Sequence, residues 1–145
     1  MVAGGGGQVI FISSIAGRLV MPYWGTYNMT KFALSAAADV LRQEQAELGV
    51  GVQVSVVEPG TYHTGFNQRV MATKYEWLDK QSAFYPMLER IKKREEQMFS
   101  WLERQSTASI VAKIVQAVQA SRPHLRYSAP WWQYLFVQLL RIFGK

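Results

Sequence analysis

The apolar positions of the chain follow two periods in alternation, one typical of buried strands and the other of amphipathic helices. The run QVIFIS at residues 8–13 is apolar and rich in β-branched residues, as expected for a strand covered on both faces, and VQVSVV at residues 52–57 predicts a second strand. Between them, residues 23–48 begin as a loop and continue with apolar residues at the helical period. Strands separated by a helix predict a parallel α/β sheet.

The remainder of the chain predicts mainly helices. Pro59 and Gly60 end the second strand, because proline cannot continue a central ladder. Helical patterns then occupy residues 66–78, 83–104 and 107–120, and the charges at residues 92–96 suggest a solvated helix face. A short strand at residues 125–128 and a helix at residues 131–143 follow. No repeat or Pro-rich linker divides the 145 residues, which predicts one domain.

That predicted domain has too few strands for a complete sheet. Two or three parallel strands form only the edge of a sheet and leave one strand with an unpaired, largely apolar border. We therefore expect residues 1–145 to be part of a larger domain.

Composition and charge exclude several classes of protein. The chain has no cysteine, which excludes a disulfide scaffold, a thiolate nucleophile and a Cys-ligated zinc site. His63 and His124 are isolated, so no metal site is expected. The net charge is +6, but the aromatic residues gather in one apolar segment instead of lying among clustered Lys and Arg. Nucleic-acid binding is therefore not expected.

The C-terminal segment leaves two interpretations open. Residues 131–143 are interrupted by polar residues and are too short to span a bilayer, which needs about 20 residues. A cytoplasmic protein is therefore expected. The segment from residue 122 onward carries no acid and includes Arg122, Arg126, Arg141 and Lys145. Peripheral membrane attachment through residues 131–143 is the alternative to their packing as a docked helix.

The candidate chemistry begins at Tyr27 and Lys31, at the start of the long helix. Residues four apart lie on the same helical face, so the two side chains point together. An ammonium beside a phenol favours the phenolate and lowers the pKa of the tyrosine. The spacing therefore predicts that Tyr27 acts as a general acid or base.

Two further motifs flank this pair at the carboxyl ends of the two strands, where parallel sheets bind ligands. The first strand ends in Ser13-Ser14-Ile15-Ala16-Gly17, and the second ends in Pro59-Gly60-Thr61-Tyr62-His63-Thr64. In this order and at these intervals, the motifs resemble the short-chain dehydrogenase/reductase family. The likeness is specific over residues 8–64 and weaker from there to the C-terminus. It implies the C-terminal half of a doubly wound, Rossmann-like parallel sheet.

The resemblance implies a role for each matching residue. Ser14 would polarise the substrate oxygen, and the thirteen-residue interval to Tyr27 favours it over the competing Ser13. Tyr27 would give or take the proton. Lys31 would lower the pKa of Tyr27 and bind the ribose of NAD or NADP. Pro59 and Gly60 would pass close to the nicotinamide, and Thr64 would hydrogen-bond its carboxamide or the phosphates.

The family likeness also implies a substrate and a division of the chain. Glu58, before Pro59-Gly60, is similar to the branch of retinol and hydroxysteroid dehydrogenases, which suggests a lipophilic small-molecule alcohol or carbonyl substrate. Residues 8–64 would carry the catalytic motifs, residues 65–121 the substrate-side helices, and residues 122–145 the last strand and helix. The long helix resembles one that many members pair across a dimer interface, which implies a homo-oligomer.

The family's dinucleotide-binding motif is not among these residues. The run Gly4–Gly7 precedes a strand, whereas the family's TGxxxGxG loop follows a strand and opens a helix. We therefore expect a truncated catalytic half that is inactive alone. The alternative is a non-catalytic remnant acting as a dimerisation module.

Overall fold

The computed structural model describes residues 1–76 and 78–144. Trp77, inside the helix predicted at 66–78, and Lys145, in the basic C-terminal segment, lie outside the described residues. The chain forms two compact units, one of Met1–Gly60 with Ala108–Lys145 and one of Thr61–Thr107. The extent of the predicted domain and its three segments stay predictions.

The first unit is built on a three-stranded parallel sheet in the order β1-β2-β3. Its strands are β1 (Gly7–Ile12), β2 (Val52–Pro59) and β3 (Arg126–Ala129), and a 3-10 turn, η1 (Val2–Gly4), precedes them. Gly7 pairs with Val52 at one end of the β1–β2 ladder, and Val56 pairs with Arg126 where β3 begins. This sheet confirms the parallel α/β fold predicted from the alternating pattern.

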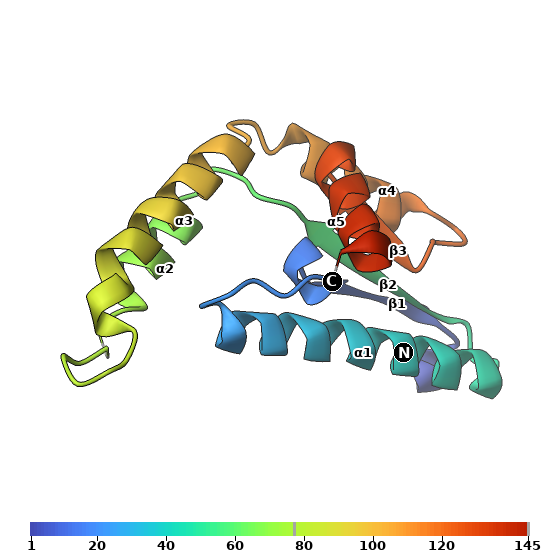
Figure 1. Ribbon diagram of the computed structural model, residues 1–145. Helices are drawn as coiled ribbons and strands as arrows, with labels where there is room; N and C mark the ends of the chain where they lie inside the picture. Colours follow the sequence, from blue (N-terminus) through green and yellow to red (C-terminus); the bar gives the residue numbers. More distant parts are fainter. Residues whose placement is uncertain (77, 145) are drawn as a thin grey trace. The chain divides into compact units, whose positions relative to one another are not determined.

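Helices cover both faces of the sheet (Figure 1). Helix α1 (Gly25–Leu48) lies along one face, and α4 (Ala108–Gln119) lies on the other. Helix α5 (Trp131–Phe143) packs against β3. Because the three strands run parallel to one another, their carboxyl ends lie at the same end of the sheet.

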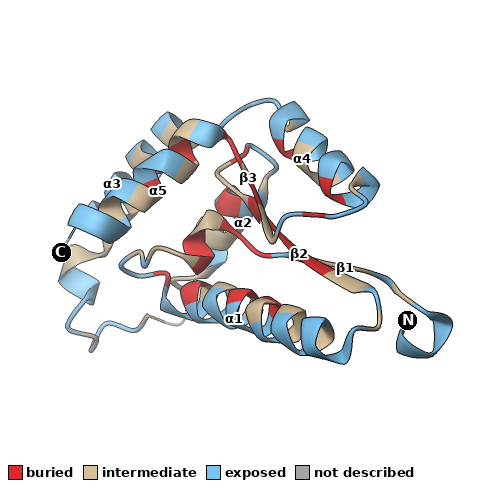
Figure 2. Cartoon of the chain, turned by 90° about the vertical axis from the view of Figure 1, so that its right-hand side faces the viewer, coloured by how far each residue is buried: buried red, intermediate tan, exposed pale blue. Residues whose placement is uncertain are grey.

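The core lies between α1 and β2. Val54 and Val56 are buried in contact with Ala38 of α1. Partly buried apolar residues complete this cluster, namely Phe11, Leu41 and Leu125. Buried residues are concentrated on β2 and on the side of α1 turned to it (Figure 2). The run predicted as a strand at residues 52–57 thus lies in the central strand, which α1 and α4 cover on its two faces.

The second unit contains α2 (Phe66–Thr73), a 3-10 turn, η3 (Tyr85–Met87), and α3 (Leu88–Leu102). The helix predicted at 83–104 is wrong at its start. Pro86 has no N–H to donate to the carbonyl four residues earlier, as an α-helix requires, and a 3-10 turn occupies this position instead. The expectation of a solvated face at residues 92–96 is also wrong for Glu95, which is buried and accepts hydrogen bonds from Lys74 Nζ and Tyr75 Oη.

Candidate functional site

Ser13 and Ser14 follow the last residue of β1 and bond to different elements. Ser13 Oγ donates to the Lys31 carbonyl at 3.0 Å and lies 3.1 Å from Ser35 Oγ, so this side chain contacts α1. Ser14 Oγ accepts the Ala16 amide at 3.1 Å and donates to the Pro59 carbonyl at 3.3 Å. Ser14 therefore caps the 3-10 turn η2 (Ile15–Gly17) and contacts the carboxyl end of β2.

Tyr27 and Lys31 occupy the first turns of α1. Lys31 Nζ lies 5.7 Å from the centre of the Tyr27 ring and donates to the Ile12 carbonyl at 3.3 Å. The rings of Trp24 and Tyr27 make a T-shaped contact, with ring centres 5.7 Å apart. Partial burial lowers the pKa of the Lys31 ammonium. Lys31 thus contacts the last residue of β1, two residues before Ser14. This contact brings Tyr27 and Lys31 of α1 and the Ser14 turn to the same end of the sheet.

The segment after Ser14 is held against α1 by a buried asparagine. Asn28 Nδ2 donates to the carbonyls of Ala16 and Leu19, both at 2.8 Å, and Asn28 Oδ1 accepts the Met21 amide at 3.1 Å. Sequence reasoning missed Asn28. The available signal was its position next to Tyr27 on the same helix. An asparagine that is buried there needs hydrogen-bond partners for its amide.

Gly17 permits the close approach of η2 to α1. A Cβ atom there would lie 2.7 Å from the Lys31 carbonyl oxygen and 2.9 Å from Ser13 Oγ and from Ser35 Oγ. Only glycine fits without a shift of these atoms. The glycine of the SSxxG motif therefore serves packing of the serine turn onto the helix that carries Tyr27 and Lys31.

The Pro59-Gly60 turn packs against the start of α5. The Gly60 amide donates to the Ala129 carbonyl at 2.7 Å, and a Cβ atom on Gly60 would collide with Gln133 Oε1 and lie 2.8 Å from Pro130 Cδ. The side chain of Gln133 is buried. The turn is thereby fixed beside β3. The carbonyl of Pro59, within the turn, accepts the Ser14 hydroxyl.

Thr64 belongs to the second unit and is described within that unit only. It is exposed, and its amide donates to the Tyr62 carbonyl at 3.0 Å. In the same unit, His63 Nδ1 lies 2.7 Å from Glu103 Oε2. Within the first unit, the structure brings Ser14, Tyr27, Lys31, Pro59 and Gly60 to the carboxyl end of the sheet, and Thr64 lies in the second unit.

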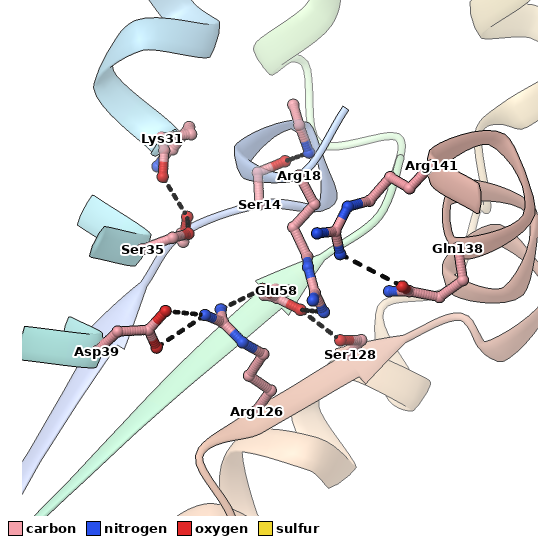
Figure 3. A network of polar contacts seen from close by, with 12 residues as sticks. Ser14, Arg18, Lys31, Ser35, Asp39, Glu58, Arg126, Ser128, Gln138 and Arg141 are labelled. Carbon is pink, nitrogen blue, oxygen red and sulfur yellow. Dashed lines mark hydrogen bonds and ion pairs between the residues drawn. The ribbon is translucent and has the colours of Figure 1, made fainter. Parts of the chain in front are cut away.

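Glu58 is the centre of a polar network that sequence reasoning did not find (Figure 3). Its buried carboxylate accepts hydrogen bonds from Arg126 at 2.7 Å and from Ser128 Oγ at 2.8 Å. Arg126 also bonds to Asp39 of α1, at 2.6 Å and 2.8 Å. The partners lie 68 and 87 residues apart, so no local pattern could have indicated them.

Among the described residues, no group of three or more His, Cys, Asp or Glu side chains could hold a metal ion. No helix in the described part of the chain is long and apolar enough to cross a membrane.

Comparisons with known proteins identify the same family as the motifs. Residues 1–75 match the sequence profile of the family described as short chain dehydrogenase. The chain is 34% identical over 140 residues to D-beta-hydroxybutyrate dehydrogenase, mitochondrial, of Mus musculus, covering 87% of this chain and 40% of that protein. It is 28% identical over 137 residues to 17-beta-hydroxysteroid dehydrogenase type 6 of Homo sapiens, covering 86% of this chain and 41% of that protein.

Solved structures give the same result for the fold. A short-chain dehydrogenase from Streptomyces avermitilis matches with a TM-score of 0.68 at 25% identity, over 95% of this chain and 47% of that one. A short chain dehydrogenase/reductase from Burkholderia phymatum, solved in complex with NAD, matches with a TM-score of 0.69 at 18% identity, over 96% of this chain and 48% of that one. The chain spans less than half the length of each of these relatives. With its ordered motifs and the family match over residues 1–75, it belongs to the short-chain dehydrogenase/reductase family.

Proposed function

We propose that residues 1–145 supply the catalytic half of an NAD(P)-dependent oxidoreductase that interconverts an alcohol and a ketone or aldehyde. The observation that carries this proposal is the meeting of the Ser14 turn with the Tyr27–Lys31 face at the carboxyl ends of β1 and β2. This is the edge where doubly wound sheets bind ligands.

Each group is suited to one part of the reaction. The Tyr27 hydroxyl gives the proton to the carbonyl oxygen in reduction and takes it from the alcohol in oxidation. Ser14 holds that oxygen by a hydrogen bond, which requires its hydroxyl to turn from the Pro59 carbonyl toward the substrate. Lys31 Nζ lies 5.7 Å from the centre of the Tyr27 ring, so its charge can stabilise negative charge that develops on the Tyr27 oxygen during proton transfer.

The residues present fit the nicotinamide end of the cofactor. The Lys31 ammonium carries three N–H donors, and the contact with the Ile12 carbonyl uses one, so donors remain for the ribose hydroxyls. The bound cofactor supplies or accepts the hydride. No TGxxxGxG loop occurs among the 145 residues, so the pyrophosphate would be held by a part of the enzyme outside them.

Two of the relatives have names that bear on the proposed substrate class. The names of the two curated relatives refer to a hydroxybutyrate and to a hydroxysteroid. Both compounds are alcohols, but only the steroid is strongly apolar. We propose a lipophilic alcohol or ketone of the retinoid or steroid kind, because Glu58 precedes Pro59-Gly60 as in that branch.

The test is an assay of the complete enzyme against matched secondary alcohols and ketones of increasing hydrophobicity, with each nicotinamide cofactor. We expect nicotinamide oxidation or reduction that depends on both partners and is greatest for the apolar substrates. Turnover confined to short hydroxy acids would contradict the lipophilic class, and absence of turnover throughout would contradict the oxidoreductase proposal.

Self-association is a second candidate function, favoured by the outer side of α1. Met29, Phe32 and Val40 are large apolar residues exposed on this helix. We propose that two copies pair through this side. Light scattering should give the mass of a dimer, and Met29→Lys with Val40→Lys should return it to that of a monomer. A wild-type monomer would contradict the pairing.

Peripheral membrane contact through α5 is a further proposal about partners. Exposed apolar residues recur along one side of this helix, at Trp131, Leu135, Phe136, Leu139, Ile142 and Phe143. Flotation with anionic liposomes should carry the wild-type protein but not a Phe136→Glu, Leu139→Glu variant. Wild-type protein left entirely in the unbound fraction would contradict this contact.

A further inference from the structure

Two segments of the first unit contact the buried carboxylate of Glu58 on β2, and α1 is joined to them through Arg126. Glu58 Oε1 accepts Arg126 Nη1 at 2.7 Å, and Glu58 Oε2 accepts Ser128 Oγ at 2.8 Å. Arg18, which follows η2, brings Nη1 to 3.6 Å from Glu58 Oε2. Arg126 Nη2 contacts both carboxylate oxygens of Asp39 on α1, at 2.6 Å and 2.8 Å (Figure 3).

The register of the sheet places these groups together. Glu58 pairs with Ser128 across the β2–β3 ladder, and Val56 pairs with Arg126. Positions two apart in a strand share a face, so Arg126 and Ser128 both flank Glu58. Arg126 is then the one described side chain that bonds both to Glu58 on the sheet and to a carboxylate of α1.

Burial makes this arrangement costly to break. The Glu58 side chain is fully buried, whereas the side chains of Arg126 and Asp39 are 20% and 38% exposed. A buried carboxylate that loses its partner retains its desolvation penalty, so removal of one member is strongly destabilising even where the pair itself adds little. The network therefore resists separation of α1 from the end of β2.

Both ends of this connection lead to the candidate site. Glu58 immediately precedes Pro59, whose carbonyl accepts the Ser14 hydroxyl. Asp39 lies on the helix that carries Tyr27 and Lys31. We propose that Arg126 is a positioning residue, which fixes the Tyr27–Lys31 helix relative to the Ser14 turn through Asp39 and Glu58. This inference rests on the proposed function for its effect on turnover.

The guanidinium is essential to the argument because it bonds in two directions at once. Its planar fork presents separate nitrogens to Glu58 and Asp39, whereas the ammonium of lysine is a point charge on a flexible stem. Arg126→Lys should therefore keep the charge near Glu58 and lose the fixed connection to α1. The Arg126→Lys variant therefore separates the effect of the two-way hydrogen bonding from the effect of the positive charge.

The experiment compares Arg126→Lys with Arg122→Lys, an exposed control in the same segment, in the complete enzyme. We expect Arg126→Lys to lower kcat at least about tenfold, because small misplacements of reacting groups are costly. KM for the nicotinamide should stay nearly unchanged. Asp39→Asn should lower kcat similarly, and Asp39→Glu, which keeps the charge, should restore most of it. The Asp39→Asn, Arg126→Lys double variant should be non-additive, because the two residues act as one unit.

A second measurement on the same proteins is independent of catalysis. Amide exchange at Ala16 and Gly17, whose N–H groups donate to Ser14 Oγ and the Ser14 carbonyl, should accelerate in Arg126→Lys and not in Arg122→Lys. Exchange in α3, within the second unit, should not change.

These results separate the possible outcomes. Unchanged exchange at Ala16 and Gly17 in Arg126→Lys would overturn the positioning role, whatever happens to turnover. Acceleration throughout the protein with unchanged kcat per folded molecule would overturn it as well, because it would show only a loss of stability. Acceleration confined to η2 in a protein whose wild type turns over no alcohol or ketone would uphold the positioning of the Ser14 turn and contradict the proposed function.

Discussion

Ser13 and Ser14 are adjacent in sequence, yet their side chains contact different elements. Ser13 bonds to the Lys31 carbonyl and approaches Ser35, both on α1. Ser14 contacts the Pro59 carbonyl at the end of β2. We therefore propose that Ser14 contacts the substrate and that Ser13 serves the packing of β1 against α1.

Substitution of each serine should separate these roles. Ser14→Ala should lower turnover of the complete enzyme by about 100-fold, the usual cost of removing one hydrogen-bond donor to a reacting oxygen. Ser13→Ala should lower the free energy of unfolding by about 1 kcal/mol and leave turnover close to wild type. Steady-state kinetics and urea titration measure the two effects. Equal losses of turnover would contradict the assignment.

Lys31 should trade stability for function. Partial burial lowers the pKa of its ammonium, so the unfolded chain binds more protons than the folded chain between the lowered pKa and the ordinary lysine value. The destabilisation is complete below the lowered pKa and disappears as pH rises toward the ordinary value. Lys31→Met should therefore raise the free energy of unfolding at neutral pH, by a difference that shrinks in alkaline solution.

Denaturant titrations of Lys31→Met across this pH range check the sign. Lys93→Met, at an exposed position, is the matched control and should show no such trend. A Lys31→Met protein that is less stable than wild type by the same amount at every pH would contradict the burial argument.

The contact between η2 and α1 depends on Gly17. A Cβ atom at this position would meet three oxygen atoms closer than 3.0 Å. Gly17→Ala should lower the free energy of unfolding by about 1–3 kcal/mol, the usual cost of overpacking. Gly25→Ala, at the start of α1 with open space around its Cβ position, should change the free energy of unfolding by less than about 1 kcal/mol. Equal effects of the two substitutions would show that the contact is not tight.

At the level of elements, much of the fold could be predicted from periodicity. The strand predicted at 52–57 lies within Val52–Pro59, and the helix predicted at 131–143 occupies Trp131–Phe143. The helix predicted at 83–104 begins at Leu88 instead. The apolar periodicity does not take account of Pro86, which has no N–H for an α-helical hydrogen bond.

Long-range polar contacts were harder to predict than the elements. The candidate residues Ser14, Tyr27 and Lys31 stand out because their spacing is local. The hydrogen-bond partners of Glu58, Arg126 and Ser128, come from β3 far along the chain, and the β2–β3 register brings them to it. A single sequence contains no signal for that register at this position.

At the scale of the whole molecule, residues 1–145 should not bind NAD(P)H measurably by themselves. In the proposed function, Lys31 and the Pro59-Gly60 turn would contact only the nicotinamide end, and no TGxxxGxG loop occurs in the sequence. Loss of about 4 kcal/mol of contacts weakens binding roughly a thousandfold. Calorimetric titration of the 145-residue chain with NADH and with NADPH should show no heat of binding. Micromolar affinity for either would mean that these residues hold more of the cofactor than the nicotinamide end.

The dependence of hydride transfer on the Tyr27 hydroxyl tests the catalytic assignment most directly. In the complete enzyme, Tyr27→Phe removes the proton donor and keeps the ring that Trp24 and Lys31 contact. Turnover should fall by roughly a hundredfold or more, while cofactor affinity stays nearly unchanged. Tyr85→Phe, at an exposed position of η3, should match the wild type. Near-normal turnover in Tyr27→Phe would contradict the catalytic role of Tyr27 and the site built around it.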